Sequence, residues 1–225
     1  MKRYGFLAIW CDMAAEDLED YRNWLTREHI ADRTVLPGFL GVRLFEALDD
    51  ERSHVILYAT AGPEILTGEA YRRVLDNPSE WTRHIMPKFG PFDRALGEQV
   101  LKTGNGFGSH VAVWRLRGDA RLPDLEKLKT KLAPLSSSPG IAGVRLFAVD
   151  HGTTDRHSTE KTMRGGVEGD FQFLLCAEAM GEGPVRNIQA DLTARMADLL
   201  PGLAIADCSC RRMIYGEAAH EASFG

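Results

Sequence analysis

An internal repeat constrains the fold of this chain more than any other feature of its sequence. Residues 37–45 read PGFLGVRLF and residues 139–147 read PGIAGVRLF, so seven of nine residues are identical at a displacement of 102. Upstream, residues 6–10 (FLAIW) align with residues 110–114 (HVAVW) at a displacement of 104. Self-similarity over more than one element indicates a repeated structural unit. We therefore interpret the chain as two fused copies of one unit.

Both copies have the same order of predicted elements. β-Branched and aromatic runs predict strands, and apolar residues at three- and four-residue steps predict helices. In the first copy we expect strands at 3–11, 41–45, 53–61 and 93–102, with a helix from 17 to about 29 and another at 63–75 that is interrupted at Gly68. In the second copy we expect strands at 108–116, 143–147, 171–179 and 204–216, with helices from 123 and at 184–200. This β-α-β-β-α-β order is that of the ferredoxin-like split unit.

The predicted fold class is α+β, with two tandem ferredoxin-like units. One face of each four-stranded sheet is left without helices, and an apolar face in water would cost about 25 cal/mol per Å². We expect the two units to cover these faces by packing sheet to sheet. The predicted boundaries are 1–104 and 105–217, with a polar insertion at 150–170 and a tail at 218–225. A homodimer of the fused chain is compatible with this arrangement.

Composition narrows the function classes. Hydrophobic residues make up 44% and charged residues 26% of the chain, which is typical of a soluble globular protein. The net charge of −5 and the lack of a basic stripe argue against nucleic acid as a partner. The apolar run at 5–11 is too short to span a membrane, and the scattered cysteines predict reduced thiols, so a cytoplasmic location is expected. Nucleotide-binding and hydrolase motifs do not occur in the sequence, and Cys208 with Cys210 alone is a poor zinc signal.

The two copies differ in their polar and aromatic residues. Residues 21–29 read YRNWLTREH, whereas the equivalent helix of the second copy is rich in Lys and Leu and has no His, Trp or Tyr. Residues 77–84 read NPSEWTRH and have no obvious counterpart in the second copy. Packing alone should tolerate the same residues twice, so we expect the chemistry in the first copy.

These segments resemble a known family. The pattern Tyr21-x-x-Trp24, Glu28-His29 and Pro37-Gly-Phe, together with the segment at 77–83, is similar to the dimeric α+β barrel superfamily and in particular to its EthD-like branch. The resemblance covers residues 3 to about 100 and implies an intramolecular barrel built from the two copies. The superfamily includes cofactor-free oxygenases, isomerases, cyclases, decarboxylating enzymes and haem-handling enzymes, so the fold does not fix one reaction.

Two histidines are the candidate catalytic residues. His29 shares a predicted helical face with Tyr21, which would point it toward the sheet. The alternative is a histidine at a helix C-terminus that interacts with the helix dipole. His84 and Trp81 lie three residues apart, so one helical turn would bring an imidazole and an aromatic ring to one side. Trp81 could equally be a core anchor.

Further candidates are substrate-binding residues. Arg43 and Arg145 occupy equivalent strand positions, where a guanidinium could hold an anion or form an internal ion pair across the sheets. His110 replaces Phe6 of the first copy, as a second polar pocket or as a hydrogen-bonded core histidine. The insertion at 150–170 is interpreted as an exposed loop, with a lid as the alternative.

The sequence thus predicts a cofactor-independent acid–base enzyme, such as an isomerase, decarboxylase or other lyase, that acts on a small aromatic or cyclic acid. His29 and His84 would divide the base and acid roles, and the pocket would be formed by Tyr21, Trp24, Trp81, Arg43 and His110. No metal and no cofactor are expected. The alternatives are a cofactor-free monooxygenase and a non-catalytic barrel that binds a small ligand or haem.

Overall fold

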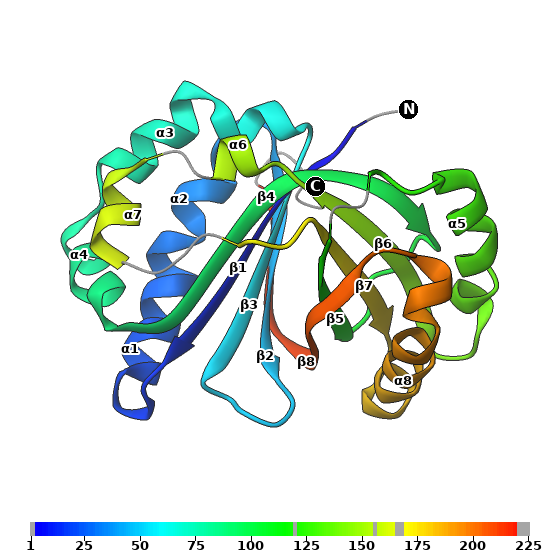
Figure 1. The fold of residues 1–225 in the computed structure, drawn as a ribbon. Coiled ribbons are helices and arrows are strands. Elements are labelled where there is room, and N and C mark those ends of the chain that lie inside the picture. Colours follow the sequence, from blue (N-terminus) through cyan, green and yellow to red (C-terminus); the bar gives the residue numbers. More distant parts are fainter. Residues whose placement is uncertain (1–2, 119–120, 155–156, 165–168, 220–225) are drawn as a thin grey trace. The chain divides into compact units, whose positions relative to one another are not determined.

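The computed structural model describes residues 3–118, 121–154, 157–164 and 169–219. Its contacts divide the chain into two units (Figure 1). Unit 1 comprises residues 1–98, 150–169 and 214–225, and unit 2 comprises residues 99–149 and 170–213. The two units are described separately below.

Unit 1 contains an antiparallel sheet whose strands follow the predicted order. The strands are β1 (Gly5–Met13), β2 (Phe39–Ala47), β3 (Ser53–Thr60) and β4 (Phe89–Thr103), arranged as β4-β1-β3-β2. The Pro-Gly turn before β2 depends on glycine, since Gly38 has a φ of 90° and a Cβ there would lie 2.5 Å from the Ile65 side chain. Behind the turn, the register between β2 and β3 shifts by one residue between Phe39 and Gly41.

The first helical segment of unit 1 is longer than predicted. It runs through the 3₁₀ turn η1 (Ala15–Asp17), α1 (Leu18–Trp24), the π-helical turn η2 (Leu25–His29) and α2 (Ala31–Thr34). His29 is therefore inside a helical segment, and the alternative of a terminal histidine on a helix dipole is wrong. The remaining helices are η3 (Pro63–Thr67), α3 (Glu69–Asp76), α4 (Glu80–Ile85) and η4 (Met86–Lys88).

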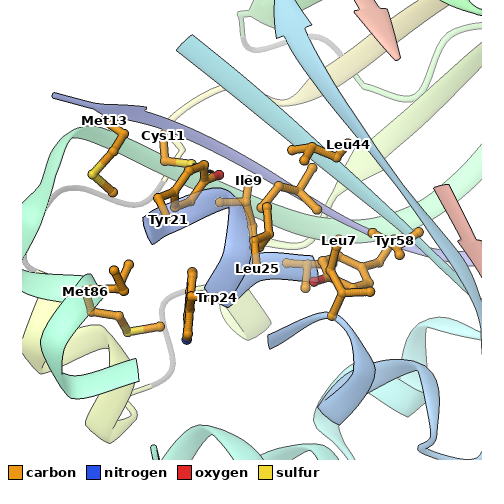
Figure 2. Close-up of a cluster of buried hydrophobic side chains, with 14 of the residues drawn as sticks. Leu7, Ile9, Cys11, Met13, Tyr21, Trp24, Leu25, Leu44, Tyr58 and Met86 are labelled. Atoms are coloured by element: carbon orange, nitrogen blue, oxygen red, sulfur yellow. Dashed lines mark hydrogen bonds between the residues drawn. The ribbon is translucent and has the colours of Figure 1, made fainter. Parts of the chain in front are cut away.

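The core of unit 1 lies between its sheet and its helices. Alternate residues of β1, from Leu7 to Met13, point toward α1, where Tyr21, Trp24 and Leu25 meet them (Figure 2). All of these side chains are buried. The helical period of Leu18, Tyr21 and Leu25 that the sequence predicts is confirmed by this packing.

Unit 2 repeats the arrangement of strands and turns. Its strands are β5 (His110–Arg117), β6 (Ile141–Val149), β7 (Phe173–Ala179) and β8 (Ala204–Ala218), arranged as β8-β5-β7-β6. Gly140 has a φ of 79°, and the register between β6 and β7 shifts between Ile141 and Gly143, as in unit 1. The helices are α5 (Leu125–Leu132), η5 (Leu135–Ser137) and α8 (Glu182–Leu199), and α8 packs on β5 and β7.

The eight strands form a closed antiparallel barrel in the order β1-β3-β2-β8-β5-β7-β6-β4. The last strand of each βαββαβ segment contributes to both units, since residues 99–103 of β4 belong to unit 2 and residues 214–218 of β8 belong to unit 1. The predicted α+β barrel is confirmed. Among the described residues, every helix is too short or too polar to cross a membrane.

The insertion at 150–170 differs from the prediction. It forms α6 (His151–Thr154) and α7 (Thr159–Arg164), and it belongs to unit 1 although it follows β6 of the second copy. The interpretation as an exposed loop is wrong for α7, because Glu160 and Arg164 are buried there. The polar residues that made this segment look unable to pack are satisfied by charged and aromatic partners in unit 1. Residues 155–156 and 165–168 of the insertion lie outside the described residues.

Candidate functional site

Unit 1 contains a small enclosed cavity between its sheet and its helices. The walls come from β1, β3 and β4 on one side and from α1, η2, α2, α3 and α7 on the other. The cavity volume is about 30 Å³, which is room for one or two water molecules. Aromatic and aliphatic side chains form about half of the wall, and most of the other lining residues are polar or charged.

His29 lines this cavity from the π-helical turn. The π turn is closed by the Ile30 amide, which donates to the carbonyl of Leu25 over 2.9 Å. One extra residue per turn rotates the side chains that follow, and such turns often occur at functional sites. The imidazole is buried against the indole of Trp24, with ring centroids 4.1 Å apart. Among the described residues, His29 Nδ1 has no hydrogen-bond partner.

The environment keeps His29 neutral. Burial disfavours the imidazolium, and the nearby charge of Arg33 adds repulsion, so the pKa of His29 lies well below its usual value. A neutral imidazole has one unprotonated ring nitrogen and can accept a proton. The residue therefore has the protonation state that a general base requires.

This pKa shift predicts a pH dependence of stability. The unfolded chain protonates His29 near pH 6.5, whereas the folded chain does so only at lower pH, so the free energy of unfolding should fall as the pH decreases below about 6.5. His29 alone contributes a slope of at most about 1.4 kcal/mol per pH unit. Urea unfolding between pH 7.5 and 5.5 measures this slope. The slope should be smaller in His29→Gln by that amount, and parallel curves would contradict the shift.

A buried ion pair closes the cavity next to His29. Arg33 Nη2 donates to both carboxylate oxygens of Glu160, over 2.8 and 2.9 Å, and Arg33 Nη1 donates to the carbonyl of His29 over 2.9 Å. Both side chains are almost fully buried. This pair joins α2 to α7 and connects His29 to a guanidinium group.

Several charged side chains line the cavity. Besides Arg33, the wall includes Arg94 from β4 and Arg164 from α7, together with the carboxylate of Glu160. The Arg164 guanidinium lies 4.0 Å from the ring centroid of Phe92, and Arg94 donates to the Tyr71 hydroxyl over 3.4 Å. Guanidinium groups in this wall are suitable partners for an anionic group.

A larger pocket adjoins the cavity. Its volume is about 310 Å³, and it shares Leu75, Arg94 and Ser158 with the inner cavity. This size suits a small organic molecule, whereas the inner cavity does not. The shared residues mark where the two spaces adjoin.

The aromatic residues of the sequence motif hold the helices together. Trp24 Nε1 donates to Thr82 Oγ1 over 3.1 Å, and Trp81 Nε1 donates to Asp20 Oδ1 over 3.0 Å. Both bonds join the first helical segment to α4. Trp24 also lines the cavity, whereas Trp81 packs on the core as a partly buried anchor.

Glu28 of the motif has a similar linking role. Its carboxylate accepts hydrogen bonds from Ser79 and Thr82, and Ser79 is the N-cap of α4. Glu28, Ser79 and Thr82 thus form one polar network between the first helical segment and α4. This network fixes the helix that presents His29.

Tyr21 lies behind the cavity wall. Its hydroxyl pairs with the thiol of Cys11 over 3.2 Å, and Cys11 lines the cavity while Tyr21 does not. Burial raises the pKa of Tyr21 well above its ordinary value, so the phenol stays neutral. Tyr21 therefore supports the wall and does not contact a molecule in the cavity.

His84 is not brought together with His29. Its side chain is 59% exposed on α4, where Nε2 lies 2.9 Å from Lys88 Nζ and 3.5 Å from Asp20 Oδ2. The predicted proximity of Trp81 and His84 is present, since both contact Asp20. Among the described residues, however, His84 is not part of the cavity wall. The geometry gives no support to a shared acid and base pair.

The remaining candidates lie outside the cavity as well. Arg43 on β2 is partly exposed, with its guanidinium 5.4 Å from the Phe45 ring centroid. Its repeat equivalent Arg145 forms a buried ion pair with Glu178 over 2.6 Å. This pair joins the neighbouring strands β6 and β7, so it lies within one sheet, whereas the alternative interpretation expects a pair across the sheets. His110 on β5 is half-buried and contacts Ser109 Oγ over 3.0 Å.

Arg33 and Glu160 are the main site residues that the sequence did not reveal. Arg33 lies four residues after His29, so an extended helical period would have placed it on the same face. Glu160 and Arg164 follow Arg33 by more than 100 residues and belong to a segment without apolar periodicity. No local pattern predicts that they close a site in the first copy.

Comparisons with known proteins support the fold. No protein family model matches the sequence, and no curated protein matches it either. Among solved structures, an anthrone oxidase-like protein has a TM-score of 0.65 at 11% identity, with 98% of this chain and 94% of that chain covered. A putative monooxygenase from Fusobacterium nucleatum subsp. nucleatum has a TM-score of 0.56 at 13% identity, with 97% and 96% covered.

A third similar structure is a haem-binding protein from Thermus thermophilus. Its TM-score is 0.52 at 9% identity, with 96% of this chain and 92% of that chain covered. Identities this low show a shared fold alone. The chain has the α+β barrel fold, and its structural neighbours include proteins described as oxidase-like, monooxygenase and haem-binding.

Proposed function

We propose that unit 1 holds a cofactor-independent enzyme site in which His29 removes a proton from a small aromatic or cyclic acid. One observation carries the proposal: a neutral, buried imidazole, whose Nδ1 has no partner among the described residues, lines a cavity with three arginines. A histidine kept only for packing would normally have its ring nitrogens hydrogen-bonded. Burying His29 Nδ1 without a hydrogen bond to the described residues costs folding free energy, and such a cost is often found at functional residues.

The charges around His29 also suit a base that works on an anion. In the unliganded cavity, burial and Arg33 hold the pKa of His29 low, which makes it a weak base. An anionic substrate would add a negative charge beside the ring and raise this pKa toward neutrality. His29 would thus become a stronger base only when the substrate is bound.

Proton abstraction is the step that the residues support. Removal of a proton next to a carbonyl or carboxyl group leaves a carbanion or enolate, which the guanidinium groups can stabilise. Isomerisation and elimination can both begin in this way. We extend the proposal to membership of the EthD-like branch by tandem duplication, supported by the repeated Pro-Gly turns and the matching register shifts of the two sheets.

A second candidate function is a cofactor-free oxygenation. It is favoured by the similarity in fold to an anthrone oxidase-like protein and to a putative monooxygenase. The same deprotonation by His29 would produce an electron-rich anion that reduces O₂ itself. A haem site does not fit this cavity, because a volume of about 30 Å³ does not admit a porphyrin and His84 is exposed beside Lys88.

Isotope exchange tests the proposal even while the product of the reaction is unidentified. A panel of aromatic acids, phenols and lactones is incubated with the protein in D₂O, and proton loss is followed by NMR while an electrode records O₂. We expect at least one compound to exchange a proton or to consume O₂. A compound that raises the melting temperature and neither exchanges nor reacts would indicate a binding protein and contradict the enzyme assignment.

A further inference from the structure

Arg33 holds the carboxylate of Glu160 in a way in which it could also hold the carboxylate of a ligand. Both oxygens of the Glu160 carboxylate accept from Arg33 Nη2, at 2.8 and 2.9 Å, inside the cavity that His29 lines. Arginine is the side chain best suited to hold a carboxylate in this manner. The segment that supplies Glu160 follows Arg33 by 127 positions and is an insertion relative to the repeat.

We propose that Glu160 occupies the place of a ligand carboxylate, and that the site binds a small aromatic carboxylate in exchange for Glu160. The inference rests on the proposed function and names its substrate class. The aromatic part of the ligand would lie among Trp24, Phe89 and Phe92, which line the same cavity. The carboxylate would then lie next to His29, whose carbonyl already accepts from Arg33 Nη1.

The size of the cavity requires such an exchange. About 30 Å³ holds one or two water molecules and excludes a benzene ring while Glu160 is in place. The adjoining pocket of about 310 Å³ is large enough, and Ser158 lines both spaces two residues before Glu160. Movement of this part of α7 would therefore join the two spaces into one.

The two partners differ in how firmly they are held. Arg33 belongs to the long helical segment that packs on β1, and its Nη1 is fixed by the His29 carbonyl. Glu160 belongs to a six-residue helix that contacts α3 and η4. At the start of this helix, the Thr159 amide donates to Asp76 Oδ1 over 3.2 Å on the surface. A short peripheral helix yields more readily than the core segment.

Arg94 marks the route of the anion. It belongs to β4 and lines both the outer pocket and the inner cavity. A carboxylate that enters the outer pocket would meet this guanidinium first and Arg33 next. Positive charge along the path raises the local concentration of an anion.

An internal competitor lowers the apparent affinity of the ligand. Because Glu160 is tethered to the same chain, it faces Arg33 at a high effective concentration. The measured dissociation constant is then the intrinsic one divided by the fraction of molecules with Arg33 accessible. Removing the charge of Glu160 should consequently tighten carboxylate binding, which is the opposite of what loss of an ordinary site residue would do.

Calorimetric titration of the full chain with benzoate and with benzamide tests the exchange. The two probes share ring and size, and only benzoate carries a charge at pH 7.5. We expect Glu160→Gln to bind benzoate at least about tenfold more tightly than the unmodified chain. Benzamide should gain less, because it also needs the space of Glu160 but places no charge against Arg33. Glu182→Gln is the matched control, because Glu182 pairs with Arg186 on the exposed face of α8 and should leave both affinities unchanged.

A double variant covers the case in which Glu160→Gln does not fold. Arg33→Met with Glu160→Met removes both charges together and avoids an isolated buried ion. It should lose the preference for benzoate over benzamide. Unchanged or weaker benzoate binding in Glu160→Gln, or a retained preference in the double variant, would overturn the inference.

The outcome can be separated from that of the proposed function. His29→Gln should bind benzoate as tightly as the unmodified chain, because Arg33 and not His29 holds the carboxylate. If benzoate binding follows the expectations while His29→Gln keeps full turnover, only the assignment of His29 fails. If turnover depends on His29 while Glu160→Gln does not tighten binding, only the exchange fails.

Discussion

Replacing His29 with glutamine is expected to lower turnover of the substrate found by isotope exchange by about 10²–10⁴-fold, the usual contribution of a positioned general base. Glutamine has a similar size and polarity, but its amide does not accept a proton at neutral pH. The loss should appear in kcat, because His29 is not the group that holds the substrate. Steady-state kinetics of the purified variant give both kcat and KM, and circular dichroism checks that the chain is folded.

The matched variant is His84→Gln. The sequence pattern expects His84 to share the acid–base chemistry, whereas the geometry places it on the surface beside Lys88 and Asp20. If only the histidine in the cavity takes part in the reaction, His84→Gln keeps nearly full turnover while His29→Gln loses it. Equal losses in the two variants would favour the expectation from the sequence, and full activity of His29→Gln would remove the base from the proposed mechanism.

The fold was predictable because its signals are local and occur twice. Strands show as β-branched and aromatic runs, and the Pro-Gly turns at residues 37 and 139 fix where a strand must begin. Gly38 and Gly140 both adopt a positive φ, which explains why these turns are alike in the two copies. Where the pattern in one repeat was ambiguous between helix and strand, the aligned segment of the other repeat indicated which to expect.

The site was only partly predictable, because it depends on contacts between distant segments. The helical period predicted that His29 faces the sheet, and the structure buries it there. The π turn that sets its orientation has no sequence signal of its own. Glu160 contacts Arg33 although the two residues are 127 positions apart. Its segment is polar, and polar insertions are normally expected on the surface, so composition predicted an exposed Glu160. Each charge of a buried ion pair is stabilised by the other. The sequence of one segment alone therefore does not predict that its charged residue is buried.

A residue type alone does not show whether the side chain contacts a ligand or holds two helices together, as the tryptophans of the motif illustrate. Trp24 and Trp81 suggested the walls of a pocket, and Trp24 does line the cavity. The indole nitrogens of both residues, however, donate to Thr82 and Asp20 on neighbouring helices. An indole N–H needs an acceptor when it is buried, and here the acceptors lie on neighbouring helices. The pattern around His29 therefore preserves the position of the helix as much as the chemistry.

The second prediction with a large effect concerns the ion pair of unit 2. Glu178→Ala is expected to lower the free energy of unfolding by about 3–5 kcal/mol, the typical cost of breaking a buried pair. Both side chains are at most 3% exposed, and Glu178 also accepts from the Gly108 amide over 2.9 Å. Glu178 pairs with Gly143 in the sheet of unit 2, and the equivalent pair in unit 1 is Ala59 with Gly41. Alanine has no carboxylate, so Arg43 cannot form the same ion pair. Urea unfolding at pH 7.5 measures the change.

Two further variants separate charge burial from general packing. Arg145→Met with Glu178→Met removes both charges and should cost much less than Glu178→Ala, because no buried ion is left behind. Glu182→Ala removes a carboxylate from an exposed pair on α8 and should change the free energy of unfolding by less than about 0.5 kcal/mol. If the double variant is as unstable as Glu178→Ala, the loss reflects packing around β7 and not an isolated charge. The comparison tests whether burial of Arg145 depends on the carboxylate of Glu178 on the neighbouring strand.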